Sequence, residues 1–211
     1  MPTQPDLGYR KGQAAPGERL PGFALVADIG ATYTNDNATT PETSLMSTGA
    51  AIADAFPAAK NIGDSYDILV AGTFLNTSGS NKTNRIRIYH GAFAIFDQTT
   101  GLLSSNAATR NWWVRLTVMV SVVGTTSTGN LRVFGDAYGF GSAIPGTGAG
   151  WNSTATNMAS SNGGEATGTS ANLATNAARD FNVTCVHSAA GTSLSTVMNL
   201  CVVRQFPKNL K

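Results

Sequence analysis

The chain has 211 residues and is low in charge, because Asp, Glu, Lys and Arg make up only 12% of it, about half the share in typical soluble proteins. The formal net charge of +2 gives no basic face for nucleic acid, and no run of residues approaches the ~20 apolar positions of a membrane-spanning helix. Two cysteines argue against a disulfide scaffold, whereas 42% hydrophobic residues suffice for the core of one domain.

Residues 1–22 are predicted to form an extended N-terminal arm, because Pro and Gly recur throughout them. Proline lacks a backbone donor and glycine resists ordering, so neither a helix nor a strand is favoured. The segment has no apolar run, and we expect no cleaved secretory signal. Such an arm is either a disordered tail or a strap that becomes ordered on a neighbouring subunit. Its candidate partner contacts are Arg10, Lys11 and Arg19.

From residue 23 to 211 the hydrophobic pattern has a period of two residues, which predicts β-strands. One inward row comprises Ile68, Val70, Gly72 and Phe74, and a longer one comprises Trp112, Val114, Leu116, Val118, Val120 and Val122. Strands are predicted at 23–29, 44–48, 67–75, 84–90, 92–97, 112–123, 130–138, 181–187 and 196–206.

The connections between these strands contain Gly, Asn, Ser and Thr. Residues 76–84 and 124–130 are predicted to be hairpin-type turns that join antiparallel strands. Residues 50–60 have room for one short helical turn, which Pro57 would cut. Many short strands without a helical stripe predict an all-β fold, an antiparallel β-sandwich of jelly-roll type over residues 23–211.

Residues 139–170 form the longest stretch without a strand pattern. A loop of this length in a compact domain is either functional or disordered. Trp151 within it must either fill a groove or contact a partner, and it is a candidate partner contact.

The residues capable of chemistry form no recognisable catalytic or metal site. His90 and His187 lack the spacing of metal ligands. Cys185 and His187 lie two apart on one strand and project in parallel, which suits proton transfer poorly. Cys185 and Cys201 either bridge the last two strands or serve as small buried hydrophobes. The acidic residues are scattered and nominate no catalytic pair, so we expect no enzyme activity, no cofactor and no metal.

The outward positions of the predicted strands are more apolar than a monomeric sandwich requires, and apolar residues on both sides of a strand imply that both sides are covered. Because arginines share these faces, we expect a mixed polar and apolar subunit interface in a homo-oligomer of cyclic symmetry. Its candidate residues are Leu69, Leu75, Arg85, Arg87, Trp113, Arg115 and Met119.

Five short segments follow one another along the chain in a characteristic order. The first is Glu-Thr-Ser-Leu, which begins at Glu42, and the second is Gly63-Asp64, which precedes a strand that ends in Gly-Thr-Phe. They are followed by Arg-Ile-Arg-Ile from Arg85, a long strand from Trp112 and a last strand that ends at Arg204. Over residues 42–206 this order resembles the jelly-roll structural proteins of tailed bacteriophages, found as capsid decoration (cement) proteins and as tail-fibre head domains.

The resemblance implies a virion structural protein that forms trimers. Our leading interpretation is a decoration protein on the capsid surface, assembled in the host cytoplasm, which clasps the major capsid protein and needs neither nucleic acid nor membrane. The alternative is a tail-fibre or receptor-binding head whose 139–170 loop contacts a host glycan or protein. A third interpretation is a polysaccharide depolymerase with carboxylates at a subunit boundary.

Overall fold

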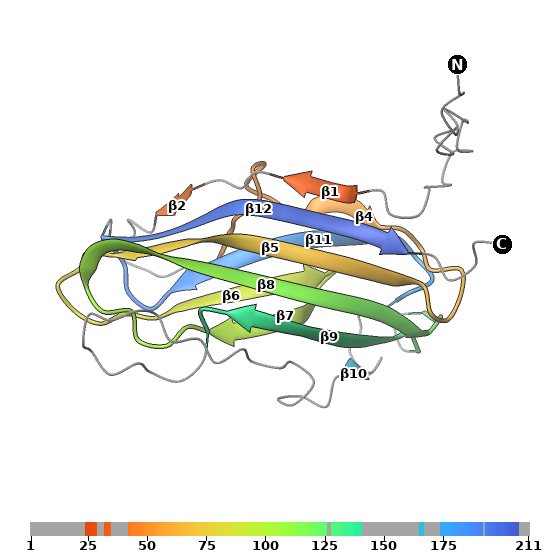
Figure 1. The fold of residues 1–211 in the computed structure, drawn as a ribbon. Helices are drawn as coiled ribbons and strands as arrows, with labels where there is room; N and C mark the ends of the chain where they lie inside the picture. The colour runs from red at the N-terminus through yellow and green to blue at the C-terminus, as the bar shows by residue number, and fades with distance from the viewer. Residues whose placement is uncertain are drawn as a thin grey trace, which may run out of the picture.

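The structure is a computed structural model that describes residues 24–28, 32–34, 42–125, 128–140, 165–166, 174–191 and 193–206. These residues form two antiparallel sheets that pack face to face (Figure 1). The described part of the chain contains no helix, and therefore none that is long and apolar enough to cross a membrane. The prediction of an all-β fold with antiparallel sheets is confirmed.

The larger sheet has seven strands. In spatial order they are β1 (Ala24–Asp28), β12 (Leu194–Phe206), β5 (Ser65–Asn76), β8 (Asn106–Val122), β9 (Asn130–Tyr138) and β10 (Glu165–Ala166), and β2 (Thr32–Thr34) also pairs with β12. Figure 1 shows β12, β5, β8 and β9 lying side by side in one layer.

The smaller sheet has five strands and lies behind the first in Figure 1. In spatial order they are β3 (Thr43–Ser44), β11 (Arg179–His187), β6 (Asn84–His90) and β7 (Phe93–Thr99), and β4 (Ile52–Phe56) also pairs with β11.

The strand pairing is nested along the chain. The first strand, β1, pairs with the last, β12, while β3 and β4 pair with β11. Further inward, β5 pairs with β8 and β6 pairs with β7. The two sheets are completed by the contacts of β12 with β5 and of β11 with β6.

The core lies between the sheets and is built from the inward rows that the period of two predicts. Ile68 and Val114 of the larger sheet belong to the same buried cluster as Ile88 and Phe181 of the smaller sheet. The Phe74 ring stacks on the buried Trp112 ring, with centroids 5.6 Å apart. Burial of large apolar side chains from both sheets is the main stabilising contribution.

Gly72 makes room for this stacking. A Cβ at Gly72 would lie 1.8 Å from the carbonyl oxygen of Val197 and 2.8 Å from the Trp112 ring. The glycine within the inward row therefore permits β12 to approach β5 beside a large aromatic side chain.

Most predicted strands are confirmed. The ranges 84–90 and 130–138 coincide with β6 and β9, and the predicted strands at 67–75 and 196–206 correspond to β5 and β12. Of the predicted strand 44–48 only Ser44 lies in a strand, β3 (Thr43–Ser44), because a turn follows in which the Gly49 amide donates to the carbonyl of Met46.

The short helical turn for which residues 50–60 have room does not form. Ile52–Phe56 forms strand β4, in which Phe56 faces Arg179 and Ile52 faces Phe181 on β11. Phe56 is completely buried there, and its ring packs edge-on against Tyr66. Pairing with a distant strand and burial of Phe56 decide the local conformation, and Pro57 follows the last strand residue.

The predicted hairpin at 76–84 is also wrong, because these residues cross from β5 in one sheet to β6 in the other. The buried Asn76 organises the crossing: its amide donates to the carbonyls of Ser80 and Leu103, and its side-chain oxygen accepts from Ser78. The connection 124–130 does join the antiparallel neighbours β8 and β9, as predicted.

Two further expectations need correction. Val122 was predicted to point inward, but it is 36% exposed because the β8–β9 register shifts after Val120. The stretch 139–170 is not strand-free, since Glu165–Ala166 pairs with Leu131 and Arg132 of β9. The predicted arm at 1–22 lies outside the described residues, as does most of the 139–170 loop.

Candidate interaction surfaces

The predicted interface residues lie on two opposite outer faces of the sandwich. On the seven-stranded sheet, Leu69 and Arg115 are exposed, and Leu75, Trp113 and Met119 are half-buried. The remaining two, Arg85 and Arg87, project from β6 in the five-stranded sheet. The structure therefore divides the predicted set into two surfaces of different chemistry.

We call the first surface the apolar face. It is formed by outward side chains of β12, β5, β8 and β9, namely Leu200, Val202, Leu69, Ala71, Trp113, Arg115, Phe134, Asp136 and Tyr138. Three of these are large exposed hydrophobic residues: Leu69 and Leu200 at 39% and Phe134 at 44% exposure. This share of exposed apolar surface on adjacent strands is unusual for an uncovered sheet.

The apolar face is continuous across the sheet. Successive Cα partners form one row from Tyr138 through Trp113 and Ala71 to Leu200. The rings of Trp113 and Tyr138 lie nearly parallel, with an interplanar angle of 9° and centroids 6.2 Å apart. Side chains directly opposite on neighbouring strands are close enough to pack together.

Charged side chains cross the same face without pairing to one another. Arg115 and Asp136 are Cα partners on β8 and β9, and Arg204 and Asp67 are Cα partners on β12 and β5. Neither pair forms an ion pair in the described part of the chain. Asp67 instead accepts a hydrogen bond from the Thr117 hydroxyl at 2.8 Å.

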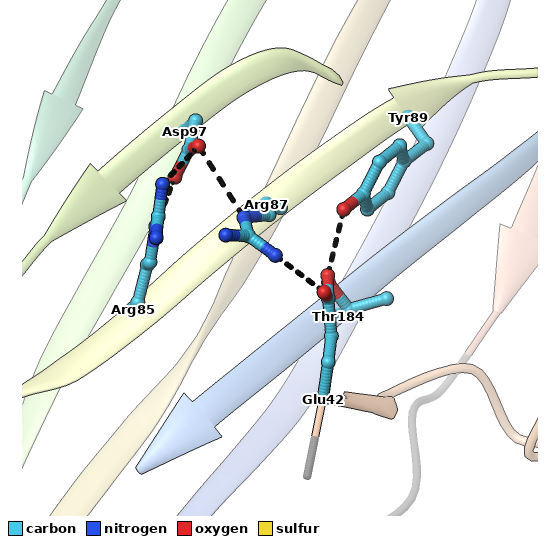
Figure 2. A network of polar contacts seen from close by, with 6 residues as sticks. All are labelled: Glu42, Arg85, Arg87, Tyr89, Asp97 and Thr184. Atoms are coloured by element: carbon cyan, nitrogen blue, oxygen red, sulfur yellow. Dashed lines mark hydrogen bonds and ion pairs between the residues drawn. The ribbon is translucent and has the colours of Figure 1, made fainter. Parts of the chain in front are cut away.

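We call the opposite surface the ion-pair face; its residues are Glu42, Arg85, Arg87, Tyr89, Asp97 and Thr184 (Figure 2). Figure 2 shows Arg87 between two carboxylates: it contacts Glu42 and lies 3.3 Å from Asp97. Arg85 donates to both oxygens of Asp97, at 2.5 Å each. Such bidentate pairing is a strong, directional arrangement.

Glu42 connects three strands from its position just before β3. Its Oε1 accepts hydrogen bonds from the Tyr89 hydroxyl at 2.8 Å and the Thr184 hydroxyl at 2.5 Å. Burial alone would raise the pKa of Glu42, but the bonds from Thr184 and Tyr89 and the positive charge of Arg87 outweigh burial and lower it. The carboxylate therefore stays ionised and holds β3 against β11 and β6.

A third cluster of polar side chains lies inside the core, around Thr196. It includes Cys185 and His187, the two residues considered from the sequence as a nucleophile and a base. The Thr196 hydroxyl lies 3.2 Å from Sγ of Cys185, 2.8 Å from Nε2 of His187 and 3.3 Å from Nδ2 of Asn84. Burial raises the pKa of Cys185 to about 12 and lowers that of His187 to about 4. Both groups are neutral near pH 7, so the thiolate of a nucleophilic cysteine does not form.

Both cysteines are buried and form no disulfide with each other, as expected of small hydrophobic residues, with Cys185 on β11 and Cys201 on β12 in different sheets. Within the described ranges, no three His, Cys, Asp or Glu side chains gather to form a metal site.

The predicted partner contacts Arg10, Lys11, Arg19 and Trp151 lie outside the described residues. Sequence reasoning also left several members of the apolar face unnamed, chiefly Tyr138, Phe134, Asp136 and Leu200. The alternation over 130–138 contained the signal for the first three. Leu200 gives no such signal, because a register shift between Met198 and Leu200 changes which residues face outward.

Comparisons of the chain with models of protein families, with curated proteins and with solved structures find no match. The resemblance to phage jelly-roll proteins thus rests on the residues that suggested it.

Proposed function

We propose that this chain is a structural protein of a tailed-bacteriophage particle, a homotrimeric capsid decoration protein that clasps the major capsid protein. The observation that carries the proposal is the apolar face, on which Leu69, Leu200, Trp113 and Tyr138 form a continuous surface. A sandwich with its own core has no internal need for this second apolar layer, so the layer favours a role in assembly.

The fold that we propose for this role is a jelly roll. Nested pairing supports it: the first strands pair with the last, and the central strands pair with each other. A long antiparallel hairpin that wraps into two sheets has this pairing, and jelly rolls of this type build viral capsids.

The buried cluster around Thr196 supports a structural role over catalysis. Cys185 and His187 are completely buried, and a substrate has no route to either in a packed core. Their contacts with Thr196 satisfy polar groups between the sheets, which is the ordinary function of a buried hydroxyl.

Antibodies raised against the purified protein test its location on particles made from the genome that encodes it, and antibodies against the major capsid protein provide the positive control. Even labelling of the shell in electron micrographs is the expected result. Labelling confined to the tail tip would overturn decoration in favour of the receptor-binding alternative, and unlabelled particles would overturn both.

The clasp is assigned to residues 1–22 on sequence grounds, and their deletion tests it. We expect the shortened protein to remain folded by circular dichroism and to lose binding to shells from which the wild-type protein has been removed. Unchanged binding of the shortened protein would overturn the assignment of the clasp.

A further inference from the structure

We infer that copies of this chain assemble through the apolar face of the seven-stranded sheet, with Arg115 of each copy pairing with Asp136 of the next. The inference rests on the proposed homotrimer, and it names the face and the ionic contact that join its subunits.

The first argument is the position of the exposed hydrophobic residues. Leu69, Leu200, Phe134 and Phe206 are each at least 39% exposed, and all four lie on strands of the larger sheet. The half-buried Trp113 lies among the first three, in the row between Tyr138 and Ala71. Aromatic and aliphatic residues gathered in this way are typical of the centre of a protein interface.

The second argument compares two cross-strand pairs of the same chemistry. Arg87 and Asp97 are Cα partners on β6 and β7, and their side chains form an ion pair at 3.3 Å. Arg115 and Asp136 have the same relation on β8 and β9, yet they form no ion pair among the described residues. Strand geometry permits the contact, so the described part of the chain leaves both side chains of the second pair able to bind another molecule.

The third argument identifies the occupant as a second copy. The apolar face and its margin carry Arg115, Arg132 and Arg204 together with Asp67 and Asp136, so charges of both signs lie on one surface. An acidic partner would be repelled by the aspartates, and a basic partner would be repelled by the arginines. A copy of the same face offers charges of both signs, and cyclic repetition of the Arg115–Asp136 contact closes a ring of subunits.

The ion-pair face is the less suitable surface. Arg85 and Arg87 are already paired with Asp97 and Glu42 within one chain. Contacts to another subunit would have to replace these bonds. The two arginines are therefore assigned to internal stabilisation, and the interface is assigned to the other sheet.

A matched pair of valine variants tests the choice of face. Val202 lies beside Leu69 on the apolar face, and Val186 lies beside Arg85 on the opposite face; both are half-buried. We expect Val202→Glu to sediment as a monomer and Val186→Glu to sediment as wild type does, with both folded by circular dichroism. The inference would be overturned if Val202→Glu still assembles as wild type does, or if Val186→Glu dissociates while Val202→Glu does not.

Charge reversal tests the ionic contact without placing a charge among apolar side chains. Arg115→Asp and Asp136→Arg should each weaken assembly at least ~tenfold, because like charges then meet across the interface. The double variant restores opposite charges and should assemble within about threefold of wild type, since the coupling between the two positions is regained. Equal weakening in the double variant would overturn the pairing.

These results are distinguishable from failure of the proposed function. If wild-type protein assembles and labels the shell but Val202→Glu also assembles, only the choice of face is wrong. If the valine variants behave as expected but the shell is unlabelled, the face stands and the decoration role fails.

Discussion

Nε2 of His187 lies 2.8 Å from the hydroxyl of Thr196, between the two sheets, where both side chains are completely buried. Thr196 belongs to the seven-stranded sheet, whereas its partners His187, Cys185 and Asn84 belong to the five-stranded sheet. One hydroxyl therefore links the sheets through polar contacts inside an apolar core.

Replacing this hydroxyl should be destabilising although the side-chain shape is preserved. Thr196→Val leaves the polar groups of His187 and Asn84 buried with one contact fewer, and we expect it to lower the free energy of unfolding by about 2 kcal/mol in urea titrations. The control is Thr99→Val at an exposed position of β7, which should change the free energy of unfolding by less than ~0.5 kcal/mol. Equal effects of the two variants would contradict a linking role for Thr196.

The two buried histidines should make the fold sensitive to acid. Burial lowers the pKa of both His90 and His187 from 6.5 to about 4. The unfolded chain therefore binds protons more readily than the folded chain between these values, and stability falls as the pH drops through that window. At pH 5 the loss should be about 2 kcal/mol for each histidine relative to pH 7.5.

His187→Gln supplies the control for this pH dependence. It removes one of the two titrating groups, so its free energy of unfolding should change about half as much between pH 7.5 and 5 as that of wild type, whatever its stability at pH 7.5. Urea titrations at pH 7.5 and pH 5, at a fixed protein concentration, measure the free energy of unfolding of wild type and of His187→Gln. A wild-type stability that is flat over this range would contradict the lowered pKa values.

Gly72 should tolerate no side chain. In Gly72→Ala the new methyl would lie 1.8 Å from the Val197 carbonyl oxygen, so β12 must move or the Trp112 ring must leave its place. We expect a loss of about 3 kcal/mol, measured by thermal unfolding with fluorescence detection of the tryptophans. The control is Ala94→Ser, which adds one atom at a half-buried position of β7 and should have little effect on stability. A Gly72→Ala variant as stable as wild type would contradict the close approach of β12 to β5 at Gly72.

The ion-pair face should contribute modestly and in a salt-dependent manner. Glu42→Gln keeps the shape of the side chain but removes the charge opposite Arg87, and it should lower the free energy of unfolding by about 1 kcal/mol. The difference should shrink in about 1 M salt, because exposed charges are screened. The control is Asp54→Asn, at an exposed residue of β4 outside the ion-pair face, which should leave the free energy of unfolding unchanged. If Glu42→Gln lowers the free energy of unfolding equally at low and high salt, the contribution of Glu42 is not ionic.

Alternation predicted the fold wherever a strand has one face in the core. The inward row of Ile68, Val70 and Phe74 and the bounds of β6 follow from it directly. It failed where distant contacts decide the conformation. β4 depends on pairing with β11, and residues 76–84 change sheets around the buried Asn76. Neither contact has a local signal in the chain.

The candidate surfaces were predictable to a similar extent. The outward positions of Leu69, Trp113 and Arg115 follow from the period of two. The separation of Arg85 and Arg87 onto the other sheet does not, because one sequence cannot show which strands are neighbours. The position of Arg115 beside Asp136, with no ion pair between them, likewise depends on the pairing of β8 with β9.

Self-assembly is the central claim, and native mass spectrometry of the wild-type chain at micromolar concentration tests it most directly. The account predicts a species of three times the 21.8 kDa chain mass. A single species at 21.8 kDa would contradict it.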